Sequence, residues 1–260
     1  MAPLITHLVI GEQVSLQVTD LRSTPCVYGT FLLGCLLVDV NNYSGVDRSQ
    51  THFVGKLQET LENPCQNSCS RFLDQMDRLL QRPWDTLFQS ERAFAAGYLC
   101  HLAADEAWKQ FGRSLWKALG ITSPDQLPVP ADILLTAFGA DSGKLFIDFP
   151  TVASALSQSS IPDIFTHVPH AALCSMWSIV QDYVLERGTP DSYFDMLART
   201  GKSPTEVRDL RRQHQAYWTK AVALTVENRY DSTQIRKTTE QAVGLVSRLA
   251  LEPNPKSGRV

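Results

Sequence analysis

The stretch Ala93-Phe-Ala-Ala-Gly-Tyr-Leu-Cys-His-Leu-Ala-Ala-Asp105 decides how the rest of the sequence is interpreted. A helix over these residues is apolar on nearly every side up to Ala104, which predicts a central, buried position. His101 and Asp105 are four residues apart, so they share one helical face with Cβ atoms about 5–6 Å apart. A buried Asp must be paired or bind a cation. The two residues therefore form either part of a metal site or a His–Asp hydrogen bond between two core groups.

Helical periodicity continues on both sides of this stretch, while alternating strand patterns are sparse. The central helix is expected from an N-cap at Ser90 to about residue 119. Thr189-Pro190 and Ser203-Pro204 each resemble a cap residue followed by Pro at the first helical position. The sequence predicts an all-α, single-domain bundle over residues 1–250 and a flexible tail over 251–260. The other expected helices cover residues 4–10, 31–38, 69–80, 151–158, 170–186, 190–200, 203–227 and 231–250.

Composition narrows the classes of function. The chain has 260 residues, with 24 Lys and Arg against 27 Asp and Glu, a balance that argues against sequence-independent binding of nucleic acid. The longest apolar run, Phe31 to Val38, is too short to span a membrane. The first residues lack the pattern of a secretory signal, so a cytoplasmic location is expected. Cys35 and Cys100 lie in apolar runs and are predicted to be buried free thiols.

Three further residues are candidate ligands, although each has a structural interpretation when taken alone. Asp39 ends the apolar run and could be a helix cap or a solvated turn residue. His52, in Thr51-His52-Phe53, could be an exposed loop residue. His7, in the apolar segment of the first helix, could be a hydrogen-bonded core residue. Together with His101 and Asp105 they form a nitrogen and oxygen ligand set that suits zinc.

The combination resembles the zinc-dependent phospholipase C family, all-helical phosphodiesterases related to the fungal single-strand nucleases. The resemblance is carried by His7, by Gly34-Cys-Leu-Leu-Val-Asp39, by Thr51-His52-Phe53 and by Gly97-Tyr-Leu-Cys-His101-Leu-Ala-Ala-Asp105. Order and rough spacing agree over residues 4–108. The resemblance implies that Asp39, His52, His101 and Asp105 surround one zinc, and that His7 joins a bridging Asp105 on a neighbouring metal.

The sequence departs from that family in ways that affect the number of metals. Phe111 stands where the family has another His, ten residues after the helix His, and no His follows before His167. The processed amino-terminal Trp ligand of secreted members has no counterpart here. Val38 also stands where the family's segment has Pro. We therefore expect one or two zinc ions, or another divalent metal, and not three.

These residues predict a divalent-metal-dependent hydrolase, most simply a phosphoesterase in which Asp39 orients or deprotonates a metal-activated water. The substrate would be a small-molecule or lipid phosphoester. Two alternatives stay open: a phospholipase C acting on phospholipids, and a non-catalytic helical protein in which a metal or a His–Asp cluster only holds the helices together.

Other polar residues near the motifs are weaker candidates for the site. Arg48 and Glu106 are expected to be solvated or structural. His167 and His170 precede or begin a helix, so the first interpretation is that they form the entry to this helix. The second interpretation is that they belong to a lid that supplies a ligand. His214 is expected on an exposed helix face.

Overall fold

The computed structural model describes residues 4–53, 67–118, 147–186, 189–212 and 230–251. Within these ranges the fold is all-α, as the sequence predicts, and the strand-like pairing consists of one antiparallel bridge between Leu80 and Phe165. The helices are α1 (Leu4–Gln17), η1 (Thr19–Arg22), α2 (Pro25–Leu37), η2 (Val38–Asn42), α3 (Arg48–His52), α5 (Ser68–Leu79), η3 (Trp84–Thr86), α6 (Gln89–Ala118), α8 (Phe149–Ser157), α9 (His170–Leu185), α10 (Pro190–Arg199) and α12 (Tyr230–Leu251).

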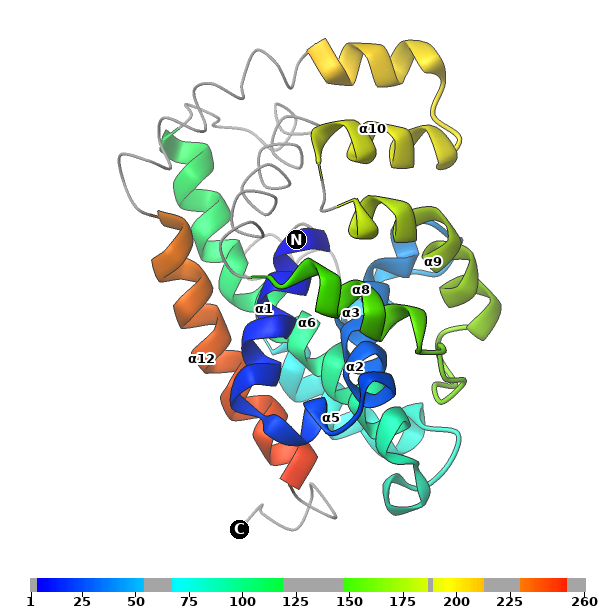
Figure 1. The fold of residues 1–260 in the computed structure, drawn as a ribbon, viewed down its shortest axis with the longest axis vertical. Helices are drawn as coiled ribbons and strands as arrows, with labels where there is room; N and C mark the ends of the chain where they lie inside the picture. Colours follow the sequence, from blue (N-terminus) through cyan, green and yellow to red (C-terminus); the bar gives the residue numbers. More distant parts are fainter. Residues whose placement is uncertain (1–3, 54–66, 119–146, 187–188, 213–229, 252–260) are drawn as a thin grey trace.

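Helix α6 lies at the centre of this arrangement, and α2 and α12 pack against it along much of its length. Helix α1 also contacts α2, α6 and α12, and Figure 1 shows α1 and α12 side by side. Phe94, Leu99 and His101 are fully buried in α6. The expectation of a central helix over Ala93–Ala104 is therefore confirmed, and Cys35 and Cys100 are buried free thiols as predicted.

Helices α2 and α6 cross at unusually short range because glycines face each other. A Cβ atom on Gly97 would lie 2.0 Å from the carbonyl oxygen of Phe31, and one on Gly34 would lie 2.2 Å from that of Phe94. Real Cβ atoms do not approach backbone oxygens this closely, so only glycine fits at either position. The crossing brings the turn of α6 that carries His101 onto the turn of α2 that carries Cys35.

Helices α9 and α10 pack against each other, and Figure 1 shows helical residues 204–212 continuing this stack away from α1. Charged side chains join its layers. Arg211 contacts Asp191 at 3.2 Å and Asp195 at 3.4 Å, and its guanidinium lies over the ring of Phe194. These contacts are exposed, so each contributes little to stability.

Helix boundaries agree with the sequence to within a few residues, with three corrections. The first helix continues to Gln17 instead of ending near Ile10, and the second begins at Pro25 instead of Phe31. Ser90 is not the N-cap of α6, because the helix begins at Gln89 and the carboxylate of Glu91 accepts the backbone N–H of Phe88. The caps at Thr189 and Ser203 are confirmed.

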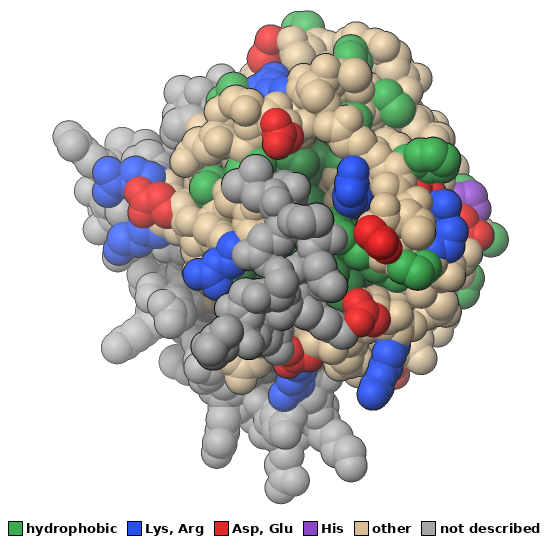
Figure 2. Space-filling view, turned by 90° about the horizontal axis from the view of Figure 1, so that it is seen from below, with side chains coloured by type: hydrophobic (Ala, Val, Ile, Leu, Met, Phe, Trp, Pro, Cys, Tyr) green, Lys and Arg blue, Asp and Glu red, His purple; other side chains and the backbone are tan. Residues whose placement is uncertain are grey.

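Parts of two predicted segments lie outside the described residues, namely 213–227 of the expected helix 203–227 and the tail from 252. Among the described helices, none has the length and apolar character needed to cross a membrane. On the face drawn in Figure 2, basic and acidic side chains are interspersed around hydrophobic ones, instead of gathering into a basic surface.

The glycine crossing gives a first testable prediction. Gly97→Ala should lower the free energy of unfolding by about 3 kcal/mol, because the added Cβ meets backbone that cannot move without shifting a helix. Gly244→Ala is the matched control. Position 244 lies on α12 with nothing within 4 Å of the added Cβ, so this substitution should stabilise by about 0.5–1 kcal/mol. Urea unfolding followed by far-UV circular dichroism measures both. Equal effects would refute the close crossing.

Candidate metal centre

The five residues singled out in the sequence converge in space. Their side chains come from four segments: His7 from α1, Asp39 from η2, His52 from α3, and His101 and Asp105 from α6. Their ligand atoms form two overlapping groups, His7–His101–Asp105 and Asp39–His52–His101, within each of which all atoms lie within 4.8 Å of one another. No residue of the five is more than 4% exposed. Buried His and Asp groups that could hold a metal ion are therefore present.

Asp39 reaches the cluster because the chain bends at its backbone. Helix α2 ends at Leu37, and Asp39 departs from helical geometry (φ −73°, ψ 15°) where the tighter helix η2 begins. The carboxylate is turned inward and only 4% of the residue is exposed. The interpretation of Asp39 as a cap or solvated turn residue is therefore wrong.

His52 reaches the cluster from α3, a five-residue helix whose ends are both defined locally. The side chain of Asp47 accepts the backbone N–H of Ser49 at 2.7 Å and caps the start, and Phe53 adopts a left-handed conformation (φ 53°) that ends the helix. His52 is the last helical residue and is buried. The interpretation of His52 as an exposed loop residue is wrong.

The spacing of the donor atoms suits a small divalent ion. Four ligands placed about 2.0–2.1 Å from zinc in a tetrahedron lie about 3.3–3.4 Å from one another. Here His52 Nε2 lies 3.1 Å from Asp39 Oδ1 and 3.6 Å from Asp105 Oδ2. His7 Nε2 lies 3.5 Å from Asp105 Oδ1, and His101 Nε2 lies 4.0 Å from Asp39 Oδ2. The observed separations bracket the tetrahedral value.

Several of these buried atoms make no hydrogen bond within the described part of the chain. They are both ring nitrogens of His7, Nε2 of His52, Nε2 of His101 and Oδ1 of Asp39. The separations given above are therefore close contacts that are not aligned as hydrogen bonds. Each buried polar atom left in this state costs about 1–3 kcal/mol. A cation bound in one of the two ligand groups would satisfy the ligand atoms of that group, so the residues present fit a bound metal.

Hydrogen bonds outside the cluster orient two of the imidazoles. His101 Nδ1 lies 2.7 Å from the carbonyl oxygen of Cys35, which can only accept, so Nδ1 carries the proton and the Nε2 lone pair faces the cluster. His52 Nδ1 lies 2.7 Å from Thr51 Oγ1, whose proton has acceptors in the Arg48 carbonyl and the Asn41 side chain. We assign the Nδ1 proton to His52 as well. Metal-binding histidines are characteristically held in this way.

The charge states also favour a cation. Burial, and next the neighbouring His7, lower the pKa of His101 to about 3, so its imidazole is neutral near pH 7. Burial opposes ionisation of Asp39, but the imidazoles of His52 and His101 outweigh it and hold the pKa of this carboxyl below its usual value. The rings of His7 and His101 stack with their centroids 3.6 Å apart. The cluster therefore offers a neutral imidazole at His101 and an ionised carboxylate at Asp39, the protonation states that bind metals.

Arg48 belongs to the cluster, which the sequence did not indicate. One nitrogen of its guanidinium lies 3.2 Å from Asp105 Oδ2 and the other 3.6 Å from Asp39 Oδ1. The side chain is 29% exposed, far more than the carboxylates it contacts. Arg48 is therefore not simply solvated, because it places a fixed positive charge against both acids.

Glu106, in contrast, has the structural role that was expected. Helix α5 begins after Asn67, whose side chain makes no capping hydrogen bond. The carboxylate of Glu106 accepts the backbone N–H of Cys69 at 2.9 Å and takes the place of a cap. Glu106 therefore joins α6 to α5 and belongs to neither ligand group.

The remaining histidines lie apart from the two ligand groups. His170 is the first residue of α9, and its Nε2 contacts the carbonyl of Ile161 at 2.9 Å, which agrees with the helix-entry interpretation. His167 lies among aromatic rings, with Nε2 3.5 Å from the hydroxyl of Tyr98, and burial lowers its pKa to about 4. It joins neither group, so no ligand role for it follows from the described residues. His214 lies outside them.

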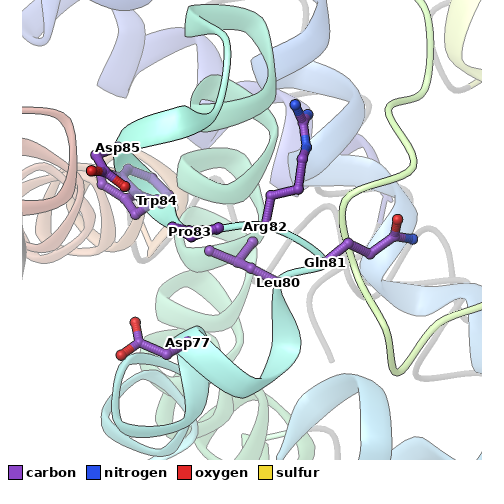
Figure 3. A pocket seen from close by; sticks show the side chains of 7 residues that line it. All are labelled: Asp77, Leu80, Gln81, Arg82, Pro83, Trp84 and Asp85. Carbon is purple, nitrogen blue, oxygen red and sulfur yellow. The ribbon is translucent and has the colours of Figure 1, made fainter.

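Two cavities in the described structure do not contain the cluster. One, of about 490 Å³, lies where α5 leads into η3, and Figure 3 shows the seven side chains that line it: Asp77, Leu80, Gln81, Arg82, Pro83, Trp84 and Asp85. A second, of about 350 Å³, borders α3 and is lined by Ser49, Gln50, Phe53, Arg71, Gln75, Leu79 and His167. The candidate metal centre is a buried cluster between helices and is not the floor of either cavity.

Comparison of the chain with protein-family models, curated proteins and solved structures finds no match. The resemblance to zinc-dependent phospholipases C therefore stays a prediction from the motifs.

The pKa of His101 predicts how stability depends on pH in the metal-free protein. His101 is neutral in the folded state down to about pH 3, whereas an unfolded histidine takes up a proton near pH 6.5. Between these values the unfolded state binds more protons, so the free energy of unfolding should fall as the pH drops. One proton corresponds to a slope of at most about 1.4 kcal/mol per pH unit.

Urea unfolding at a series of pH values across this range, with a chelator present to keep the protein metal-free, measures that slope. His101→Gln should flatten it between about pH 6.5 and pH 4, whereas the control His170→Gln, at the start of α9, should leave it unchanged. An unchanged slope in His101→Gln would show that His101 does not stay neutral on folding.

A second prediction concerns Asp105, which faces both His7 and His52. Asp105→Asn should lower the zinc content of the purified protein and abolish the rise in melting temperature that zinc gives the wild type. The reason is that metal binding to the native state is linked to folding. Asp209→Asn, at a half-exposed site far along the chain, is the control. Zinc content measured by plasma mass spectrometry and left unchanged in Asp105→Asn would remove Asp105 from the site.

Proposed function

We propose that the protein is a divalent-metal-dependent hydrolase, with zinc as the preferred ion and a phosphoester as the substrate. The observation that carries this proposal is the convergence of five buried nitrogen and oxygen donors with the guanidinium of Arg48. The donor set suits zinc. An arginine against the same carboxylates is a group that a purely structural zinc site does not need.

Each residue of the cluster has a separate role in this proposal. His7, His101 and Asp105 form one of the two ligand groups and would hold the ion, which supplies Lewis acidity and a lowered pKa for bound water. His52 faces the same site, with Nε2 3.6 Å from Asp105 Oδ2. Asp39 keeps its ionised form at neutral pH, so its carboxylate can orient a water molecule and accept its proton. Arg48 reaches from the cluster toward solvent and can contact a phosphoryl oxygen through a charge-assisted hydrogen bond.

A non-catalytic metal site is the second candidate, and one observation favours it. All five ligand residues are nearly inaccessible, with 4% exposure or less. Structural zinc sites are closed by four protein ligands, whereas catalytic sites keep a position for water. Under this alternative the ion would join α6 either to α1 or to α3 and η2, and Arg48 would only balance charge.

Phospholipid hydrolysis, the activity implied by the resemblance, is the narrower form of the first candidate. The ligand set here is smaller than the three-metal set of that family, and each missing cation removes stabilisation of transition-state charge. We therefore favour a small soluble phosphoester over a phospholipid. The cytoplasmic location expected from the sequence also stays a prediction.

Parallel assays test the proposal. Zinc-loaded protein should hydrolyse soluble phosphomonoesters or phosphodiesters and show little activity on phosphatidylcholine vesicles. His52→Ala and His101→Ala should each lower kcat/KM on the soluble substrate by at least about a hundredfold, since the ion would be lost or misplaced. His170→Ala, outside the cluster, should retain activity.

Three outcomes separate the candidates. Bound zinc that raises the melting temperature without hydrolysis of any phosphoester would support the structural site. Efficient vesicle hydrolysis that is lost in His52→Ala and His101→Ala would support the phospholipase. Zinc-independent hydrolysis in wild type and variants alike would contradict the proposed centre.

A further inference from the structure

The two ligand groups of the cluster overlap in a way that limits how many ions they can hold. Both groups include His101. Its Nδ1 already donates to the carbonyl of Cys35, so Nε2 is its single nitrogen available to a metal. One lone pair binds one ion. Two ions could not both use His101, and the group that loses it retains one imidazole and one carboxylate.

Arg48 lies where a second cation would be needed. Its guanidinium contacts Asp105 Oδ2 at 3.2 Å and Asp39 Oδ1 at 3.6 Å. These are the same two oxygens that face His52 Nε2, at 3.6 Å and 3.1 Å. The guanidinium thus spans carboxylates from two segments of the chain, which is the role of the second ion in a two-metal site.

Charge balance leads to the same conclusion. Among the described residues the two ligand groups contain two carboxylates, Asp39 and Asp105. One divalent ion cancels the two negative charges, and Arg48 then leaves a net charge of about +1, which suits an anionic substrate. Two divalent ions together with Arg48 would leave about +3 in a buried site, an arrangement with a large desolvation cost.

We propose that the centre holds a single divalent ion and that Arg48 serves as its fixed second cation. This inference rests on the proposed metal site and specifies its composition. It narrows the one or two ions expected from the sequence to one, and it makes Arg48 a positioning residue for the carboxylates Asp39 and Asp105.

Metal stoichiometry tests the inference without relying on activity. Native mass spectrometry and plasma mass spectrometry of the full chain, after equilibration with zinc and dialysis, should give one ion per chain. Arg48→Asp removes the fixed cation and adds a carboxylate at the same place, so the stoichiometry should rise to two. Arg48→Met removes the charge and adds no ligand, so the stoichiometry should stay at one, with zinc bound at least about tenfold more tightly because a nearby repulsive charge is gone. Arg78→Asp, on an exposed position of α5, controls for general electrostatic attraction and should stay at one.

The results distinguish this inference from the proposed function. No bound zinc in the wild type would overturn the metal site itself. Two ions in the wild type would overturn the inference and leave the metal site standing. One ion in both the wild type and a folded Arg48→Asp would show that Arg48 does not occupy a cation position. If Arg48→Asp does not fold, the affinity of Arg48→Met decides: weaker zinc binding than in the wild type would refute the inference.

Discussion

The close crossing of α2 and α6 is the contact on which the rest of the structure depends. Because Gly34 and Gly97 lack side chains, the two helix backbones meet directly, and no other residue fits at either point. Cys35 follows Gly34, and His101 lies one turn after Gly97, so the crossing also sets the 2.7 Å bond between the Cys35 carbonyl and His101. Asp39 is one turn beyond Cys35. The separation of this carboxylate from His101 is therefore fixed by backbone packing between two helices and not by a flexible loop.

The crossing creates an electrostatic requirement at the same place. It buries Asp39, His101 and Asp105 together, and burial by itself opposes charge on each of them. The carboxylates are nevertheless held ionised, and His101 is held neutral, so the pocket of side chains carries unbalanced negative charge until cations compensate it. Arg48 supplies one such charge from α3. Because one guanidinium cannot neutralise two carboxylates, the remaining negative charge would favour a bound divalent ion at this cluster.

Sequence reasoning located most of the fold because the helices are defined by local signals. Apolar residues on all sides of Ala93–Ala104 placed α6 at the centre, and Thr189-Pro190 marked the start of α10. The same reasoning named His7, Asp39, His52, His101 and Asp105 from spacing and resemblance, but their meeting in space depends on tertiary packing. Asp39 and His52 had exposed alternatives because their burial comes from a backbone bend and a capped short helix. Arg48 was undervalued for a similar reason: its partners are 9 and 57 residues away, and no local pattern marks such a pair.

Arg48 also bears on whether the centre is catalytic or structural. A closed zinc site needs four donors and neutral surroundings, and it does not need an arginine. An arginine added to such a site makes it positive, which is unfavourable in a buried cluster unless an anion is expected there. Arg48 is also the member of the cluster with substantial exposure, so its guanidinium joins the buried carboxylates to the outside of the described structure. A positive charge placed between a candidate ion and solvent is the arrangement expected when the ligand that completes the site is an anion, and a phosphoester is such an anion.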